Sequence, residues 1–154
     1  MTAPLLEVRD LATHFMTKAG VVKAVDGVSF SLNPGEIIGL VGESGSGKSV
    51  TGFSILGLVD PPGRIVGGSV TLDGQELVGL SGAKLRTLRG RRMAMVFQDP
   101  SATLNPVLTI ATQMKLALAA HGTTNAAEIR ERSLDVLNRV GIPDASRRLD
   151  NYPH

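Results

Sequence analysis

The chain has 154 residues, of which 42% are hydrophobic and 19% are charged, a composition that is typical of one globular domain and excludes a disordered chain. Its formal net charge of +2 is too small to indicate a nucleic-acid partner, and aromatic residues, at 3% with no Trp, are too scarce to stack single-stranded nucleic acid. The chain contains no Cys, which excludes disulfides and thiolate metal sites and agrees with a reducing compartment.

The first part of the chain has the pattern of strands and turns that lead into a glycine-rich loop. Early strands are expected at residues 5–9, 21–25 and 28–32, and the Asn-Pro-Gly sequence at 33–35 predicts a turn. Nothing ahead of these strands has the basic and apolar regions of a signal peptide. The continuous apolar run at 37–41 has the pattern of a buried parallel strand.

A helix and a hairpin are expected after the glycine-rich loop. The helix should begin at Lys48 and continue to about Leu58, before the Pro-Pro-Gly sequence at 61–63. Asp73-Gly74 lies between two short strand-like segments, which is a strong signal for a two-residue hairpin turn.

The last part of the chain is predicted to be mostly helical. Ser81 is expected to cap a short basic helix, and residues 93–97 have the pattern of a second buried strand. Two further helices are expected, at about 108–120 and after Asn125, which forms an N-cap pair with Glu128. The first of them is well short of a membrane span, so the chain is expected to be cytoplasmic and not embedded in a membrane. This order of elements predicts an α/β nucleotide-binding core with an all-β portion in front.

The glycine-rich loop at residues 42–49 carries the clearest chemical signal, because it fits the pattern G-x-x-x-x-G-K-[ST] without a mismatch. A chance match in a chain of this length is on the order of one per cent, and here a strand-like segment precedes the loop and a helix follows it. The candidate nucleotide-binding residues are Gly42, Glu43, Ser44, Gly45, Ser46, Gly47, Lys48 and Ser49 of the loop, with Val50 directly after them.

Each part of this pattern has a physical role in binding ATP with Mg²⁺. The glycines let successive backbone N–H groups point into one concavity, and the helix that begins at Lys48 adds the positive end of its dipole. Lys48 would neutralise the β- and γ-phosphates, and the Ser49 hydroxyl would ligate Mg²⁺. The dinucleotide fingerprint G-x-G-x-x-G is absent, because Val50 stands where its third glycine would be.

A second group of residues, after the glycine-rich loop, resembles a motif of a known protein family. Residues 97–106, FQDPSATLNP, resemble the Q-loop of ABC-transporter ATPases, and specifically that of the dipeptide/oligopeptide (peptide/nickel) importer branch. The loop sequence GESGSGKS and the Tyr-Pro-His sequence at 152–154 resemble the same branch, so the resemblance covers the whole chain. It implies a P-loop NTPase core with an N-terminal antiparallel β subdomain and the start of a helical subdomain.

The resemblance also implies roles for two residues outside the loop. Gln98 would approach Mg²⁺ and the attacking water, where an amide can orient water without adding charge. Phe15 stands where the family stacks an aromatic ring on adenine, although a core Phe in a strand is the alternative. One basic cluster is open to two interpretations, a solvated helix face or a docking surface for an acidic partner; it contains Arg86, Arg89, Arg91 and Arg92.

Three motifs of the family are expected after residue 154 and do not occur in this chain: an LSGGQ-like signature, a strand ending in Asp-Glu, and a switch histidine. In the family the strands that bear these later motifs complete the central sheet. Without them the sheet is expected to be incomplete and to expose apolar edges. Hydrolysis in the family needs two subunits arranged head to tail. The 154-residue chain is therefore expected to be poorly soluble or non-native, with no Mg-dependent turnover of ATP on its own.

The resemblance implies an energy-coupling subunit that binds ATP and Mg²⁺ and drives import of dipeptides or oligopeptides, with nickel or another small solute as further substrates. Its partners would be integral-membrane permease subunits, a second ATPase subunit and, indirectly, a substrate-binding protein, at the cytoplasmic face of the membrane. Residues 1–100 would form the β subdomain and nucleotide-binding core, and residues 101–154 part of a helical subdomain. The alternative is a truncated, non-hydrolysing nucleotide-binding remnant or an interaction module.

Overall fold

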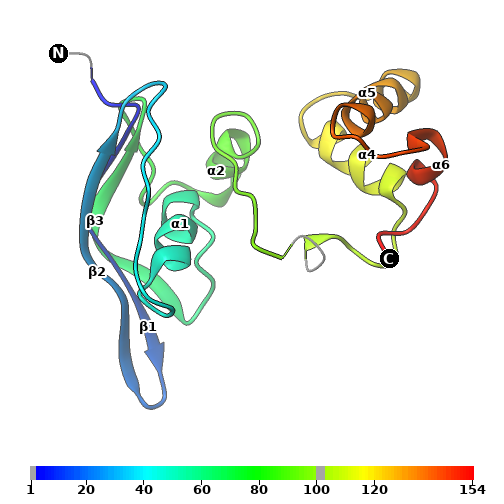
Figure 1. Cartoon of the computed structure of the whole chain (residues 1–154). Helices are drawn as coiled ribbons and strands as arrows, with labels where there is room; N and C mark the ends of the chain where they lie inside the picture. The colour runs from blue at the N-terminus through cyan, green and yellow to red at the C-terminus, as the bar shows by residue number, and fades with distance from the viewer. Residues whose placement is uncertain (1–2, 100–102) are drawn as a thin grey trace. The chain divides into compact units, whose positions relative to one another are not determined.

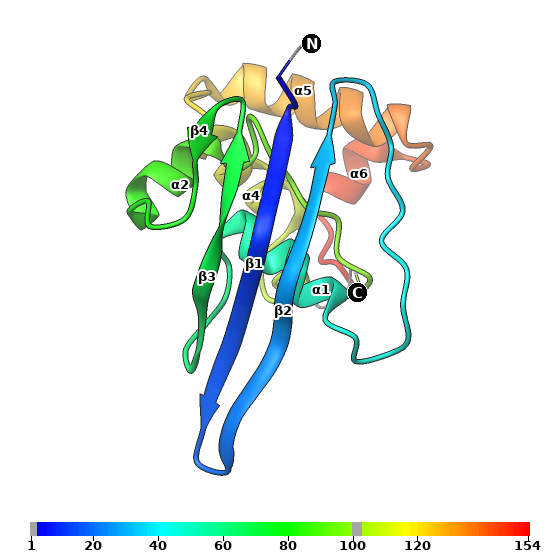
Figure 2. The ribbon, with the colours of Figure 1, turned by 90° about the vertical axis from the view of Figure 1, so that its left-hand side faces the viewer.

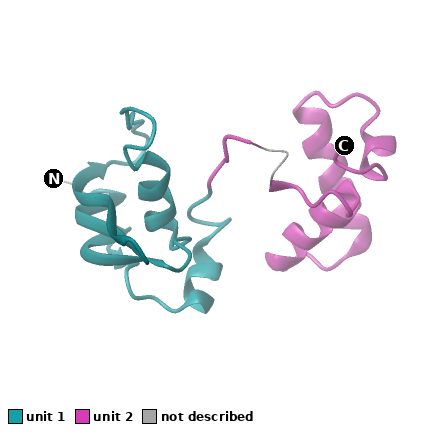
Figure 3. Ribbon diagram, turned by 90° about the horizontal axis from the view of Figure 1, so that it is seen from below, with its two compact units in different colours: residues 1–94 teal, residues 95–154 magenta. Residues whose placement is uncertain are grey.

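The computed structural model describes residues 3–99 and 103–154. The chain divides into two compact units, Met1–Ala94 and Met95–His154 (Figure 3). The assignment of residues 1–100 and 101–154 to two domains stays a prediction.

An antiparallel sheet forms the framework of the N-terminal unit. Its strands are β1 (Leu6–Thr17), β2 (Gly20–Leu32), β3 (Gly63–Leu72) and β4 (Gln75–Glu76), in the order β2-β1-β3-β4 (Figures 1 and 2). Every neighbouring pair is antiparallel, which confirms the predicted N-terminal antiparallel β subdomain. Strands β1 and β2 precede the glycine-rich loop of residues 42–49, called the phosphate loop below, and β3 and β4 follow it. The two segments expected at 21–25 and 28–32 are one strand, because β2 follows the long β1 along nearly its whole length.

The hairpin between β3 and β4 has the predicted two-residue turn. Leu72 pairs with Gln75, and the two residues between them, Asp73 and Gly74, both have positive φ, at 51° and 78°. Positive φ at both central positions matches the right-handed twist of the flanking strands and is the reason for the Asp-Gly preference.

Two helices complete the N-terminal unit: α1 (Lys48–Leu56) and α2 (Gly82–Leu88). Helix α1 lies against one face of the sheet, where Val50 and Ile55 pack on the core (Figures 1 and 2). The buried members of this core are Val8, Leu11, Val25, Val70, Leu77 and Leu85. Helix α2 begins at Ser81, whose side chain accepts a hydrogen bond from the Lys84 N–H at 3.4 Å, as the sequence predicts.

The two segments expected to be buried strands, 37–41 and 93–97, are not strands. Ile37 is 96% exposed and Val96 is 94% exposed, and among the described residues the only ladder contact in these segments is a bridge between Arg89 and Met93. A strand needs a hydrogen-bonded neighbour, and within the described residues neither segment has one along its length. The prediction of these two strands is therefore wrong for this structure, while the α/β class is confirmed by the antiparallel sheet and the helices.

The C-terminal unit contains the helices α4 (Ile110–Ala120), α5 (Ala126–Arg139) and α6 (Ala145–Leu149), which contact one another. Helix α5 begins as predicted, because Asn125 Oδ1 accepts hydrogen bonds from the N–H groups of Ala127 and Glu128 at 2.9 and 3.1 Å. Helix α6 has no counterpart in the sequence prediction. None of the helices in the described ranges has the length and apolar character that a membrane span requires.

Candidate nucleotide-binding site

The phosphate loop turns sharply into α1 through two glycines in the left-handed region. Gly45 has φ 83° and Gly47, the N-cap residue of α1, has φ 92°. A Cβ atom built on Gly47 would lie 2.1 Å from the carbonyl oxygen of Ala24 in β2, so the loop passes directly against the backbone of that strand. Glycine is therefore required at this position both for its φ and for the close approach.

The N-terminus of α1 is suited to an anion. Gly47 has no side chain to cap the helix, and the first turn contains no acidic residue. The first N–H groups of a helix have no partner inside it, and they lie at the positive end of the helix dipole. Ser49 lies exposed in this first turn. The local backbone and charge thus favour a phosphate group at this end of α1.

Lys48 folds back over its own loop. Its Nζ donates hydrogen bonds to the carbonyl oxygens of Gly42 and Glu43, at 2.8 and 2.6 Å, and to Ser46 Oγ at 3.3 Å. An ammonium group has three donors, and these three acceptors use all of them. A phosphate oxygen at the loop would replace one of these neutral acceptors with a charged one, which gives the stronger hydrogen bond.

A buried polar contact seats α1 on the sheet. The hydroxyls of Thr13 in β1 and Ser54 in α1 are 2.7 Å apart, and their residues are 0% and 3% exposed. Ser54 donates its hydrogen to the carbonyl oxygen of Val50 at 2.7 Å, so the Thr13 hydroxyl is the donor to Ser54. Sequence patterns do not predict this pair, because the partners are 41 residues apart and neither belongs to a motif.

Phe15 lies near the end of β1, where it pairs with Val22 of β2 and Gly63 of β3. Its ring covers Gly63, because a Cβ atom built there would lie 2.6 Å from Phe15 Cε1 and 2.7 Å from Val59 Cγ1. The residue is half-buried. This contact gives Phe15 a packing role in the unit, and its role in stacking adenine stays a prediction.

Gln98 is exposed and lies in an irregular segment. It belongs to the C-terminal unit, whereas the phosphate loop belongs to the N-terminal unit. Its role toward Mg²⁺ and water therefore stays a prediction. Three residues of the resembling run that follow Asp99, namely Pro100, Ser101 and Ala102, lie outside the described residues.

Comparison with known proteins decides the family. The profile described as "ABC transporter" matches residues 25–154. The chain belongs to the ABC transporter family. This confirms the resemblance that the phosphate loop and the FQDPSATLNP run predicted.

Relatives within this ABC family include a peptide import ATP-binding protein of Brucella abortus, which is 53% identical over 153 residues, covering 99% of this chain and 46% of the relative. A dipeptide transport ATP-binding protein of Escherichia coli is 45% identical over 150 residues, covering 97% of this chain and 46% of that protein. The chain spans about half the length of the curated relatives that it matches.

The fold agrees with solved structures of ABC cassettes. The dimeric structure of the bacterial ABC transporter cassette MJ0796 superposes with a TM-score of 0.78 at 23% identity, covering 96% of this chain and 61% of the cassette. A structure of the same cassette in a post-hydrolysis state, bound to ADP and Pi, matches equally well. These matches establish the ABC ATPase fold.

The donor set fits a magnesium ion held mainly by nucleotide oxygens. Within residues 3–99 and 103–154, no group of three or more His, Cys, Asp or Glu side chains could hold a metal ion. Mg²⁺ commonly keeps only one or two protein ligands and takes substrate phosphates and waters for the rest. An exposed Ser49 hydroxyl in the first turn of α1 meets this requirement.

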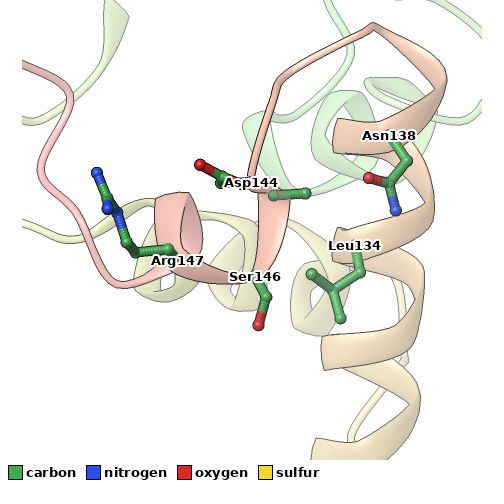
Figure 4. A pocket seen from close by; sticks show the side chains of 6 residues that line it. Leu134, Asn138, Asp144, Ser146 and Arg147 are labelled. Carbon is green, nitrogen blue, oxygen red and sulfur yellow. The ribbon is translucent and has the colours of Figure 1, made fainter.

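The C-terminal unit contains cavities of its own, but they lack the glycine-rich loop and lysine of the candidate site. One cavity of about 580 Å³ lies between α5 and α6 (Figure 4); it is lined by Leu134, Asn138, Asp144, Ala145, Ser146 and Arg147. Ser146 Oγ accepts a hydrogen bond from Arg130 at 3.3 Å. Tyr152 and His154 stack at 5.9 Å beside a second cavity of about 680 Å³. Neither cavity is lined by a glycine or a lysine.

Proposed function

We propose that this chain binds Mg-ATP at the loop of residues 42–49, as part of the energy-coupling subunit of an ABC importer for dipeptides or oligopeptides. The observation that carries the proposal is the placement of the Lys48 ammonium over a glycine-rich loop at the uncapped N-terminus of α1. The names of the relatives, which are peptide import and dipeptide transport ATP-binding proteins, support the substrate class.

Different groups of the loop bind the phosphate oxygens, the phosphate charge and the Mg²⁺ ion. The backbone N–H groups of the loop and of the first turn of α1 bind phosphate oxygens, and Lys48 balances the charge of the β- and γ-phosphates. Ser49 supplies a hydroxyl ligand for Mg²⁺, which when bound neutralises further phosphate charge. Gln98 orients the water, and Phe15 contacts the adenine.

The further parts of the proposal concern the whole protein. Its partners are the integral-membrane permease subunits, a second ATPase subunit and, indirectly, a substrate-binding protein. The subunit works at the cytoplasmic face of the membrane. Residues 1–100 contribute the β subdomain and nucleotide-binding core, and residues 101–154 contribute part of a helical subdomain that meets the permease.

Titration of the purified chain with a fluorescent ATP analogue in the presence of Mg²⁺ tests the proposal. Lys48→Ala should weaken binding by about tenfold to hundredfold, because a charged hydrogen-bond partner of the phosphates is lost. Lys84→Ala is the matched control, since this lysine lies exposed in α2 of the same unit. Equal affinities of the Lys48→Ala variant and the unchanged chain would show that nucleotide, if bound, is not bound at this loop.

A further inference from the structure

The side chain of Arg89 reaches from the end of α2 to the C-terminus of α1. Arg89 Nε donates to the carbonyl oxygen of Leu56 at 2.8 Å, and Nη2 donates to the carbonyl oxygen of Gly57 at 2.5 Å. These residues are more than 30 positions apart in sequence, and all three belong to the N-terminal unit. The contact is tightly packed, because a Cβ atom built on Gly57 would lie 2.6 Å from Leu85 Cδ1 and 3.2 Å from Arg89 Nη2.

A guanidinium group is well matched to this end of α1. The last carbonyl groups of a helix have no partner inside it and form the negative end of its dipole. The planar fork of Arg presents two donors at a fixed spacing, so one side chain bonds two successive carbonyls and brings a positive charge to them. Leu56 is only 7% exposed, which limits the access of water to this carbonyl.

The opposite end of α1 is the phosphate loop. Helix α1 has nine residues, so it is roughly 13 Å long, and a tilt at one end moves the other. Three contacts fix its placement along this length. Gly47 rests against Ala24 at the N-terminus, Ser54 is bonded to Thr13 in the middle, and Arg89 holds the carbonyls at the C-terminus.

We propose that Arg89 is a positioning residue for nucleotide binding, which holds α1 so that the N–H groups of its first turn and Lys48 meet the phosphates. The proposal rests on the proposed function of the loop. It also separates Arg89 from the other members of the basic cluster: Arg92 forms an ion pair with Asp73 in the β3–β4 turn, and Arg86 is exposed on α2. The interpretation of the whole cluster as a solvated helix face is wrong for Arg89.

Two variants and a control test this role in the purified chain. Arg89→Gln removes the charge and the fork, Arg89→Lys keeps the charge with a single donor group, and Arg86→Gln changes an exposed arginine of the same helix. Affinity is measured for an ATP analogue and for inorganic tripolyphosphate, each with Mg²⁺. The amide hydrogen exchange of residues 48–58 is measured on the same samples.

Arg89→Gln is expected to weaken binding of both ligands by about fivefold to twentyfold. The reason is that a small displacement of the N–H groups of α1 and of Lys48, which would bond the phosphates, lowers affinity steeply. Arg89→Lys should show a smaller loss, and Arg86→Gln should match the unchanged chain. A contact that served stability alone would lower the melting temperature and leave the Kd of the folded protein unchanged. That result for a folded Arg89→Gln would overturn the proposal. If Arg89→Gln does not fold, an unchanged Kd for Arg89→Lys would overturn it.

The exchange measurement separates the failure of this proposal from failure of the proposed function. If the unchanged chain binds neither ligand, the phosphate-loop function is refuted, and with it the part of Arg89 in binding. Amide exchange still tests whether Arg89 holds the C-terminus of α1: faster exchange at residues 56–58 in Arg89→Gln supports it. Unchanged exchange at these residues would refute this role of Arg89, whatever the nucleotide affinity.

Discussion

Replacing Gly47 by alanine tests how closely the phosphate loop approaches strand β2. The new Cβ atom would lie 2.1 Å from the Ala24 carbonyl oxygen and 3.3 Å from its carbonyl carbon. Both are backbone atoms of a paired strand, so no flexible side chain can move aside. The loop and β2 must instead separate by about 1 Å before the contact becomes normal.

The cost has two parts that a second variant can separate. An alanine held at φ 92° pays about 1–2 kcal/mol for the left-handed conformation. Overpacking against a rigid neighbour adds about 1–3 kcal/mol, so Gly47→Ala should destabilise the chain by about 2–5 kcal/mol. Gly45→Ala is the matched control, because Gly45 has φ 83° in the same loop with nothing within 4 Å of its built Cβ. It should cost only about 1–2 kcal/mol.

Urea unfolding followed by far-ultraviolet circular dichroism measures both free energies of unfolding, and titration with the ATP analogue measures the consequence at the site. Gly47→Ala should weaken nucleotide binding more than Gly45→Ala, because the forced shift lies at the first turn of α1. Equal losses of stability in the two variants would refute the close approach of the loop to Ala24. They would leave only the conformational strain that the variants share.

Three further predictions concern other contacts. Thr13→Val should cost about 1 kcal/mol in urea unfolding, whereas Ser54→Ala should cost about 1–3 kcal/mol because the Thr13 hydroxyl is then buried without its acceptor. Asn125→Ala should lower the free energy of unfolding by about 1 kcal/mol through loss of the α5 cap, with faster amide exchange confined to the start of that helix. The hydrogen bond from Lys23, together with its positive charge, lowers the pKa of Asp26 from its ordinary value of 3.8. This carboxylate therefore stabilises the fold above that pH, and the gain disappears as pH falls through the lower folded pKa. Asp26→Asn should therefore flatten the acid limb of a stability-against-pH curve, by a small amount because the pair is exposed.

Local rules were sufficient wherever a short segment determines its own conformation. The Asp73-Gly74 turn, the Ser81 cap and the Asn125 cap each follow from side chains within a few residues, and the structure has all three. The start of α1 follows in the same way from the phosphate-loop pattern. These are contacts between residues that are neighbours in sequence, so a single sequence contains what is needed to predict them.

Segment 37–41 shows why an apolar pattern alone does not determine a strand. Its residues have the composition of a buried parallel strand, yet Ile37 and Val41 are 96% and 89% exposed. Periodicity reports what a segment can bury; it does not report whether a hydrogen-bonding neighbour is at hand. Segment 93–97 fails in the same way beyond the bridge at Met93. Strands β1 and β3 did form, and their paired residues are 48 to 66 positions apart in sequence, from Phe15 with Gly63 to Leu6 with Leu72.

The candidate site depends on a local sequence motif and on contacts with residues distant in sequence. Only the part that depends on the motif could be predicted. The pattern at 42–49 predicts which groups would meet Mg-ATP, because glycine, Lys48 and Ser49 would act through their own backbone and side chains. It does not identify what holds those groups in place. Ala24, the Thr13–Ser54 pair and Arg89 come from three other parts of the N-terminal unit and belong to no motif. If phosphate affinity depends on the placement of α1 as well as on its N-terminal chemistry, substitutions at these distant contacts should weaken nucleotide binding while the whole motif stays intact.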